Sequence, residues 1–289
     1  MRPVPPDSAA RRYAALVAAR DEQVARLFAP AGGDRWSRSV GRFRDDPRRE
    51  PDRNLAAVME HALPADTVVD VGGGAGRMGL PFALRCREVI SVDPSPGMCA
   101  EFSAIAAEAG ITNARAVQAA WLDDHGVEGD LVLAFNVTYF LHDITAFVEK
   151  LSAAARRRVI VNGWSVPPPN QDAGLYAVAL GEPLALLPGP FELIPVLWEM
   201  GLLPDVRVLR GRFALNTAPV DTREGAIEAA LAAIRRYDRL APATLERARE
   251  NIAAGLDRLY RIEDGRYIPA WRAESRELII TWETPAARG

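Results

Sequence analysis

Short apolar runs alternate with amphipathic segments through the middle of the chain. The runs are rich in Val, Ile and Leu and cover residues 67–71, 88–92, 114–118, 130–135 and 158–161. Between them, apolar residues recur at helical spacing near residues 77–85, 96–109 and 143–155. Strands covered on both faces show such continuous apolar runs, and alternation of strands with helices is typical of a parallel sheet. The pattern therefore predicts an α/β core with five parallel strands and crossover helices.

The segment before this core has a different pattern. Residues 8–29 carry apolar side chains at helical spacing behind Asp7 or Ser8, which are residue types that cap helices. Residues 31–53 are rich in Gly, Pro and charge and show no sustained periodicity, which is typical of a long loop. A short helix is expected over 54–62. We interpret residues 1–64 as an N-terminal helical cap with a lid loop, and everything after them as the main domain.

The part after the fifth run departs from the regular alternation. An apolar, Pro-rich insertion covers residues 164–190, and a helix over 191–200 and a strand over 205–215 follow it. Residues 221–262 carry two amphipathic patterns, which predict a helical hairpin, and residues 277–282 form a last apolar strand. We expect the N-terminal cap and the hairpin to surround the carboxyl ends of the strands. The hairpin is then either a substrate lid or the interface of a homodimer.

Composition and charge narrow the classes of function. The chain has 289 residues with 35 basic and 38 acidic side chains, and a net charge of −3 does not favour a protein that binds by neutralising phosphates. Two cysteines and three dispersed histidines are too few for a disulfide framework or a zinc site. No apolar run is long enough to span a membrane, and the N-terminus lacks a secretion-signal pattern. We expect a cytoplasmic protein without a metal, membrane or nucleic-acid partner.

Candidate chemistry is concentrated at the end of the first apolar run. There Asp70 precedes glycines at positions 72, 73, 74 and 76, and the stretch leads from a strand into a helix. Because such a turn lacks side chains, backbone N–H groups can approach a ligand closely. A dinucleotide fingerprint would need glycine at the position of Arg77, so the nicotinamide version of the motif is not matched. Asp93 directly follows the second run, at the end of the predicted strand, where its carboxylate can accept hydrogen bonds from both hydroxyls of a ribose.

With these residues, the sequence from Thr67 to Trp164 resembles the class I S-adenosylmethionine-dependent methyltransferases. The resemblance implies a Rossmann-like, doubly wound sheet of seven strands with an antiparallel last strand, here with an N-terminal helical cap and a C-terminal helical insertion. It also implies that the D-x-G-x-G-x-G loop contacts the methionine part of the cofactor and that the acid after the second strand binds the ribose. The matching positions, with their neighbours in the two turns, are Asp70, Gly72, Gly73, Gly74, Gly76, Asp93 and Pro94. Met98 matches a position where an apolar side chain lies against the adenine.

Two corners of the predicted site depart from the family pattern. After the third run, alanines stand where many members carry an acid that binds the adenine amino group. Either Asp123, slightly further on, or backbone groups at Trp121 and Leu122 can take over the adenine contact. The Trp121 ring lies either against the adenine or in the core. Asn136 stands where the fourth strand ends under the transferred methyl group, but Val137 and Thr138 replace the prolines of the N-P-P-[YF] motif. That motif belongs to enzymes that methylate nucleic-acid bases and side-chain amides.

The resemblance therefore implies transfer of a methyl group from S-adenosylmethionine to a small molecule by in-line displacement, with the accepting atom left open among O, N and C. Tyr139 and His142 are the candidates for contact with the substrate, and His142 is the candidate general base because its ordinary pKa is near ~6.5. Trp36, Phe43 and the 164–190 insertion either line an acceptor pocket or pack in a core. The alternatives are an NAD-dependent oxidoreductase and a non-catalytic cofactor-binding or regulatory protein.

Overall fold

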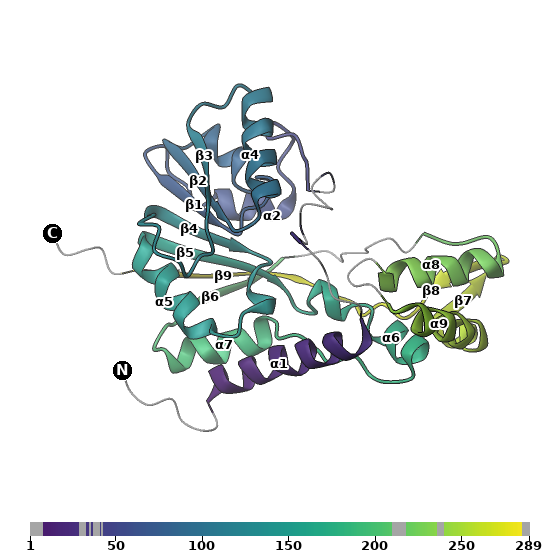
Figure 1. Cartoon of the computed structure of the whole chain (residues 1–289). Helices are drawn as coiled ribbons and strands as arrows, with labels where there is room; N and C mark the ends of the chain where they lie inside the picture. The colour runs from purple at the N-terminus through teal and green to yellow at the C-terminus, as the bar shows by residue number, and fades with distance from the viewer. Residues whose placement is uncertain are drawn as a thin grey trace.

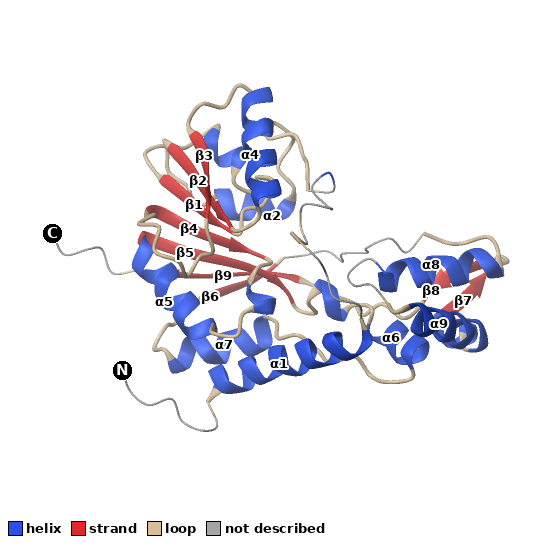
Figure 2. Ribbon diagram, in the orientation of Figure 1, coloured by secondary structure: helices blue, strands red, loops and turns tan. Residues whose placement is uncertain are grey.

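The computed structural model describes residues 8–28, 33–34, 36, 41, 43–209, 218–235 and 240–284. Its centre is a seven-stranded sheet with the strand order β3-β2-β1-β4-β5-β9-β6, drawn in red in Figure 2. The strands are β1 (Thr67–Val71), β2 (Glu88–Asp93), β3 (Ala114–Gln118), β4 (Gly129–Phe135), β5 (Ala155–Trp164), β6 (Asp205–Val208) and β9 (Glu277–Glu283). β1 to β5 are the predicted strands, and they pair in parallel. β9 lies antiparallel between β5 and β6, which confirms the predicted Rossmann-like fold.

Helices cover both faces of the sheet (Figure 1). One layer contains α1 (Ala9–Leu27), α5 (Ile144–Ala154) and α7 (Pro190–Glu199), and the other contains α2 (Arg53–Met59), α3 (Leu80–Ala83) and α4 (Pro96–Glu108). In β1, Val69 and Val71 are buried under the first layer, whereas Val68 is buried under the second. Because successive side chains of a strand point to opposite faces, a strand covered on both faces is apolar at every position.

The N-terminal helix does not lie where the sequence suggested. Ser8 caps α1, as expected, with its Oγ accepting the Arg11 backbone N–H. The helix packs along α7 and α5 on one face of the sheet, instead of covering the carboxyl ends of the strands. Buried Tyr13 connects the two regions, because its hydroxyl donates to the Thr138 carbonyl oxygen just after β4. Within the predicted lid loop, residues 31–32, 35, 37–40 and 42 fall outside the described residues.

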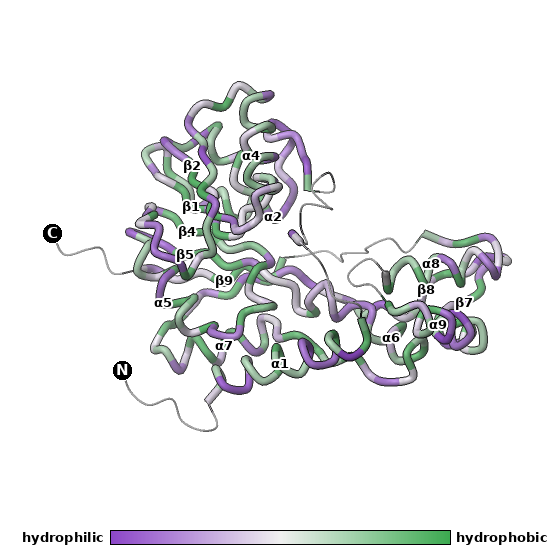
Figure 3. Tube along the Cα trace, in the orientation of Figure 1, coloured by the Kyte–Doolittle hydropathy of each residue, from purple (hydrophilic) through white to green (hydrophobic). Residues whose placement is uncertain are grey.

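A second group of elements, which we call the lobe, extends beyond the carboxyl ends of the strands (Figure 1). It consists of α6 (Ala173–Leu180), α8 (Arg223–Arg235), α9 (Pro242–Ala254), α10 (Leu256–Leu259), β7 (Tyr260–Glu263) and β8 (Arg266–Pro269). Its side chains form a hydrophobic core separate from the two layers around the sheet. Along the chain, hydrophobic residues concentrate in the central strands and on parts of the lobe helices (Figure 3). The lobe thus combines the predicted 164–190 insertion with the predicted helical hairpin.

The second helix of the predicted hairpin ends earlier than expected. The sequence pattern extended it to residue 262, whereas α10 ends at Leu259 and an antiparallel pair of strands, β7 and β8, follows. Asp264 and Gly265 form the turn with φ angles of 50° and 75°. β6 ends at Val208, and residues 210–215 of the predicted 205–215 strand lie outside the described residues. No helix in the described ranges combines the length and apolar character that crossing a membrane requires.

Candidate functional site

The glycine turn after β1 adopts backbone conformations that side chains disfavour. Gly72, Gly74 and Gly76 have φ angles of 66°, 54° and 84°. A Cβ atom on Gly72 would collide with Cγ1 of Val137, so the chain after β4 packs directly against the turn. On Gly74, in contrast, a Cβ atom would meet only the Met98 sulfur, at 3.7 Å. The turn is therefore tightly supported at Gly72 and nearly open at Gly74, where a ligand can approach the backbone.

Asp70 supports this turn from below. Its side chain is almost fully buried, at 1% exposure, and a Cβ atom on Gly73 or Gly79 would come within 2.7 or 2.6 Å of its Oδ2 atom. Burial is the main cause that raises the pKa of Asp70 to about 7; the charge of Asp93 adds to it, and the Gly79 backbone N–H opposes it. The structure thus places Asp70 under the glycines and not on their ligand-facing side.

Asp93 joins the end of β2 to the glycine turn. Its Oδ2 atom accepts the Gly74 backbone N–H at 3.0 Å, and its Oδ1 atom accepts the Ser95 backbone N–H at 2.8 Å. Burial raises the pKa of Asp93, and these two hydrogen bonds oppose the rise. Because a carboxylate oxygen has two lone pairs, both oxygens retain capacity for further donors. Pro94 beside it is exposed, and Met98 is buried at the start of α4, with its sulfur 3.7 Å from where a Cβ atom on Gly74 would lie.

The segment before α2 also reaches this region. Asp34 accepts the Ser95 hydroxyl at 2.5 Å, and Arg44 pairs with Glu101 and Glu108 on α4. Trp36 and Phe43 contact each other edge to face, with ring centroids 6.0 Å apart. The predicted wall of Trp36, Phe43 and the 164–190 insertion is not assembled as one surface, because Phe43 packs against the second helix layer and α6 packs in the lobe core.

The chain after β4 forms a polar corner beside the turn. Asn136 is exposed and has a left-handed φ of 56°. Its Oδ1 atom accepts the Tyr139 hydroxyl at 2.9 Å, and the Tyr139 oxygen accepts the Trp164 backbone N–H at 2.8 Å. Burial is the main cause that raises the pKa of Tyr139 above its ordinary value. Tyr139 therefore stays protonated at neutral pH and holds the end of β4 against the end of β5.

Sequence reasoning missed a carboxylate in the same corner. Glu277 starts β9 opposite Trp164, and its Oε1 atom accepts the Asn162 side-chain N–H at 2.9 Å and that of Asn54 as well. The Asn136 backbone N–H donates to the Asn162 carbonyl oxygen at 3.1 Å, which connects this group to the end of β4. No local pattern marks these positions, because they come from α2, β5 and β9.

Other predicted residues lie apart from this corner. His142 is exposed, with 59% of its side chain accessible, and its Nε2 atom lies 2.7 Å from Asp21 Oδ2 on α1. Trp121 is buried in the first helix layer, with its ring 4.8 Å from that of His125. Leu122 is exposed. The structure thus brings together the glycine turn, Asp93, Met98, Asn136 and Tyr139, whereas His142 contacts α1 and Trp121 packs in the core.

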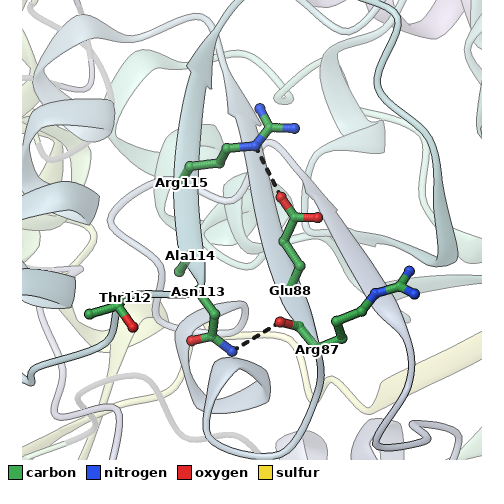
Figure 4. Close-up of a pocket in the computed structure, with 6 residues that line it drawn as sticks. All are labelled: Arg87, Glu88, Thr112, Asn113, Ala114 and Arg115. Carbon is green, nitrogen blue, oxygen red and sulfur yellow. Dashed lines mark hydrogen bonds and ion pairs between the residues drawn. The ribbon is translucent and has the colours of Figure 1, made fainter.

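A surface depression of about 290 Å³ lies elsewhere, at the amino ends of β2 and β3 (Figure 4). Its charged lining includes Arg115, whose Nε atom lies 3.2 Å from Glu88 Oε1. In a parallel sheet, ligands bind at the carboxyl ends of the strands, so this depression is at the wrong edge for the site described above. Among the described ranges, no three His, Cys, Asp or Glu side chains are placed to hold a metal ion.

Comparisons with known proteins agree with this geometry. A family model described as a methyltransferase domain matches residues 68–158. The chain is similar in structure to a putative methyltransferase from Bacillus halodurans, with a TM-score of 0.55 and 14% identity over 81% of this chain and 100% of that chain. It is also similar to the YcgJ protein from Bacillus subtilis, with a TM-score of 0.52 and 14% identity over 80% of this chain and 97% of that chain. No curated protein sequence matches it. The structural similarities establish the fold, and the matched segment contains the glycine turn, Asp93 and Asn136.

Proposed function

We propose that this chain is an S-adenosylmethionine-dependent methyltransferase, and that it transfers the methyl group to a small-molecule acceptor at the corner formed by Asn136 and Tyr139. One observation carries the proposal. The open face at Gly74, the Asp93 carboxylate bonded to its N–H, and Asn136 meet at the carboxyl ends of β2, β1 and β4. This is the edge at which doubly wound sheets bind nucleotide ligands.

The residues present fit S-adenosylmethionine. A ligand can lie against Gly74, because only the Met98 sulfur approaches the space above its Cα atom. Asp93, with acceptor capacity left on both oxygens, would bind the ribose hydroxyls, and Asp70 would keep the glycines in place from below. The cofactor supplies a methyl group on a sulfonium, which is a good leaving group. Orientation of the acceptor is therefore the main task left to the protein, and it can contribute roughly 7 to 11 kcal/mol to lowering the barrier.

Two features support a small acceptor. Val137 and Thr138 replace the motif of enzymes that methylate bases and amides, and Val137 instead packs against Gly72. The net charge of −3 provides no excess of basic residues for a nucleic acid.

The two cysteines, Cys86 and Cys99, are free thiols, which suits the reducing cytoplasm where we place the protein.

His142 as general base stays a prediction. Its ring nitrogen bonds to Asp21 on α1, and a direct role would need the ring to turn from this exposed partner towards the acceptor. His142→Ala decides the matter, because a base contributes about 10² to 10⁴ in rate, whereas loss of one exposed pair leaves the rate nearly unchanged.

Two measurements test the proposed function. Calorimetry is expected to detect binding of S-adenosylmethionine and its demethylated product, and no binding of NAD. Transfer of labelled methyl groups is then measured into a low-molecular-mass cell extract, with nucleic acid and protein fractions as controls. Label in the small-molecule fraction is the expected result. Binding without transfer to any fraction would instead favour a non-catalytic cofactor-binding protein, and binding of NAD alone would favour the oxidoreductase.

Asp93→Ala is the first variant to measure. Without the carboxylate, the ribose hydroxyls lose charge-assisted hydrogen bonds worth roughly 1.5 to 3 kcal/mol, so cofactor affinity is expected to fall at least about tenfold. Asp130→Ala is the matched control, because this acid lies at the amino end of β4, at the opposite edge of the sheet, and accepts the Thr67 backbone N–H. Unchanged affinity in Asp93→Ala, measured by calorimetry with a folded variant, contradicts the assigned role.

A further inference from the structure

Glu277 is a half-buried carboxylate near the corner formed by Asn136 and Tyr139, and the proposed function gives it no role. It lies on β9 directly opposite Trp164, whose backbone N–H holds the Tyr139 hydroxyl. Its Oε1 atom is fixed by the side-chain amides of Asn162 and Asn54. Among the described residues, nothing bonds to its Oε2 atom, and this atom is not sealed from solvent. One oxygen is thus anchored in the fold, and the other is available to a ligand.

The described side chains around Glu277 do not supply a counter-ion. No ion pair to Glu277 occurs within the described part of the chain. Arg77 acts on it only from a distance, and this guanidinium lies 3.4 Å from Asp45 and 3.9 Å from Asp52. Asp52 opposes the ionised form of Glu277, and the other described groups that face Glu277 are the neutral amides and Tyr139. A half-buried carboxylate without a cation is unfavourable, so a cationic ligand would be bound well there.

We propose that Oε2 of Glu277 binds the protonated nitrogen of the acceptor, so that this methyltransferase methylates a small-molecule amine. The proposal rests on the proposed function and names its substrate class. Binding of the acceptor nitrogen explains three features together. These are the anchored carboxylate, its open Oε2 atom and its proximity to Tyr139 and Asn162. The two asparagines are positioning residues, because they hold Oε1 and leave the other oxygen directed to the acceptor.

The same carboxylate makes the nitrogen nucleophilic. An ammonium has no lone pair, so Oε2 of Glu277 first accepts one of its N–H protons. The lone pair left on nitrogen then forms the N–C bond to the methyl carbon while the C–S bond breaks, and the electrons of that bond stay on sulfur. The products are the protonated N-methyl amine, S-adenosylhomocysteine and a protonated Glu277, which returns its proton to solvent. Atoms and charge balance without a further reactant.

Glu277→Gln tests the proposal, because glutamine keeps an oxygen for Asn162 and Asn54 and removes the charge. Glu283→Gln is the matched control: it lies at the opposite end of β9, is exposed, and pairs with Arg158. Without any acceptor, thermal unfolding at neutral pH is the first readout. Loss of an uncompensated charge is expected to leave Tm unchanged or raise it by roughly 1 to 3 °C. A fall of several degrees shows that Glu277 has a cationic partner in the protein, and it overturns the proposal.

Methyl transfer is the second readout. After separation from the cofactor, the labelled product from the low-molecular-mass extract is expected to be retained on a cation exchanger. Benzylamine is the defined amine acceptor, and benzyl alcohol and benzoate are the control acceptors without an amine. Transfer by Glu277→Gln is expected to fall at least about 100-fold, with Glu283→Gln unchanged. In the wild type, transfer should also decline as pH falls, because Glu277 becomes protonated. Burial is the main reason why the pKa of Glu277 is raised above its ordinary value. The Gln variant should lack that decline.

Cofactor binding separates this proposal from the proposed function. S-adenosylhomocysteine carries an ammonium of its own, and its affinity for Glu277→Gln is expected to stay within about twofold of the wild type. A tenfold loss of that affinity means that Glu277 holds the cofactor, which overturns the acceptor role. A labelled product that is neutral or anionic also overturns it and leaves the proposed function intact. Failure of both cofactor binding and transfer in the wild type contradicts the proposed function itself.

Discussion

At the scale of single residues, Gly74 is a position where glycine is expected for two reasons. Its backbone has a positive φ, and the open space beside it is where we place the ligand. Its φ of 54° disfavours any side chain, and a new methyl group would meet only the Met98 sulfur. Gly110, after α4, has a similar φ of 65°, and a Cβ atom there would have nothing within 4 Å. The two glycines therefore share the same backbone strain and differ in whether a ligand is expected above them.

This pair gives a direct prediction for the cofactor site. Gly74→Ala and Gly110→Ala are each expected to destabilise the fold by about 1 to 2 kcal/mol, because alanine is strained at positive φ. Only Gly74→Ala is expected to lose cofactor affinity, by at least about tenfold, since its methyl group would occupy the ligand space. Urea unfolding and calorimetry measure the two effects separately. Equal affinities in the two variants would place the ligand away from Gly74.

Asp70 yields a prediction for the pH dependence of stability. Its folded-state pKa of about 7 lies above the ordinary value of 3.8, chiefly because of burial. The native state therefore disfavours the ionised form, and the stability that the neutral group allows is lost as pH rises towards and through 7. Asp70→Asn removes this loss. Relative to the wild type, the variant is expected to gain at least about 1 kcal/mol between pH 5 and pH 8 in urea unfolding.

Asp130 serves as the control with the opposite sign. The Arg156 side chain is the main cause that lowers the pKa of Asp130, and the Thr67 backbone N–H contributes. Its contribution to stability is present above the unfolded pKa and is lost as pH falls, so Asp130→Asn should differ most from the wild type at the higher pH. If Asp70→Asn shows the same slope as Asp130→Asn, the Asp70 carboxylate is ionised in the native protein.

At the scale of elements, the sequence predicts best the helices and strands whose burial is reflected in their own hydrophobic pattern. β1 and β3 match their predicted bounds. β1 is buried at every position, which a continuous apolar run indicates, whereas β3 is an edge strand in which Arg115 and Gln118 are exposed. The β7–β8 hairpin was missed, although Asp264-Gly265 is the strongest type of short-range hairpin signal. Its strands are short and mostly exposed, so hydrophobic periodicity did not separate them from the preceding helix.

The candidate site shows the same division. The glycine turn and Asp93 were predicted because their spacing within one βα unit is itself the signal. Glu277 was not, since its partners Asn54 and Asn162 are more than 100 positions away and meet it only when β9 inserts beside β5. The partner of His142 also depends on where α1 packs, which the pattern of α1 alone does not specify.

At the scale of the molecule, the sheet and the lobe have separate hydrophobic cores. The end of α1 connects them: Phe28 lies 6.2 Å from Tyr176, ring to ring, and Arg26 pairs with Glu182. The proposed cofactor site, at the glycine turn, Asp93 and Asn136, is built from the ends of β1, β2 and β4, whereas α8 and α9 contact mainly α6 and each other. This arrangement makes the lobe a unit that can open without disrupting the glycine turn.

Hydrogen exchange with and without S-adenosylhomocysteine tests this division. Ligand binding stabilises the states that hold the site, so exchange is expected to slow at least about tenfold in the glycine turn and the first turns of α4. Amides of α8 and α9 should keep their rates within about twofold, because their core contains none of the cofactor residues. Equal slowing in both regions would mean that the lobe closes on the bound cofactor, as a substrate lid would, and that its core does not open independently.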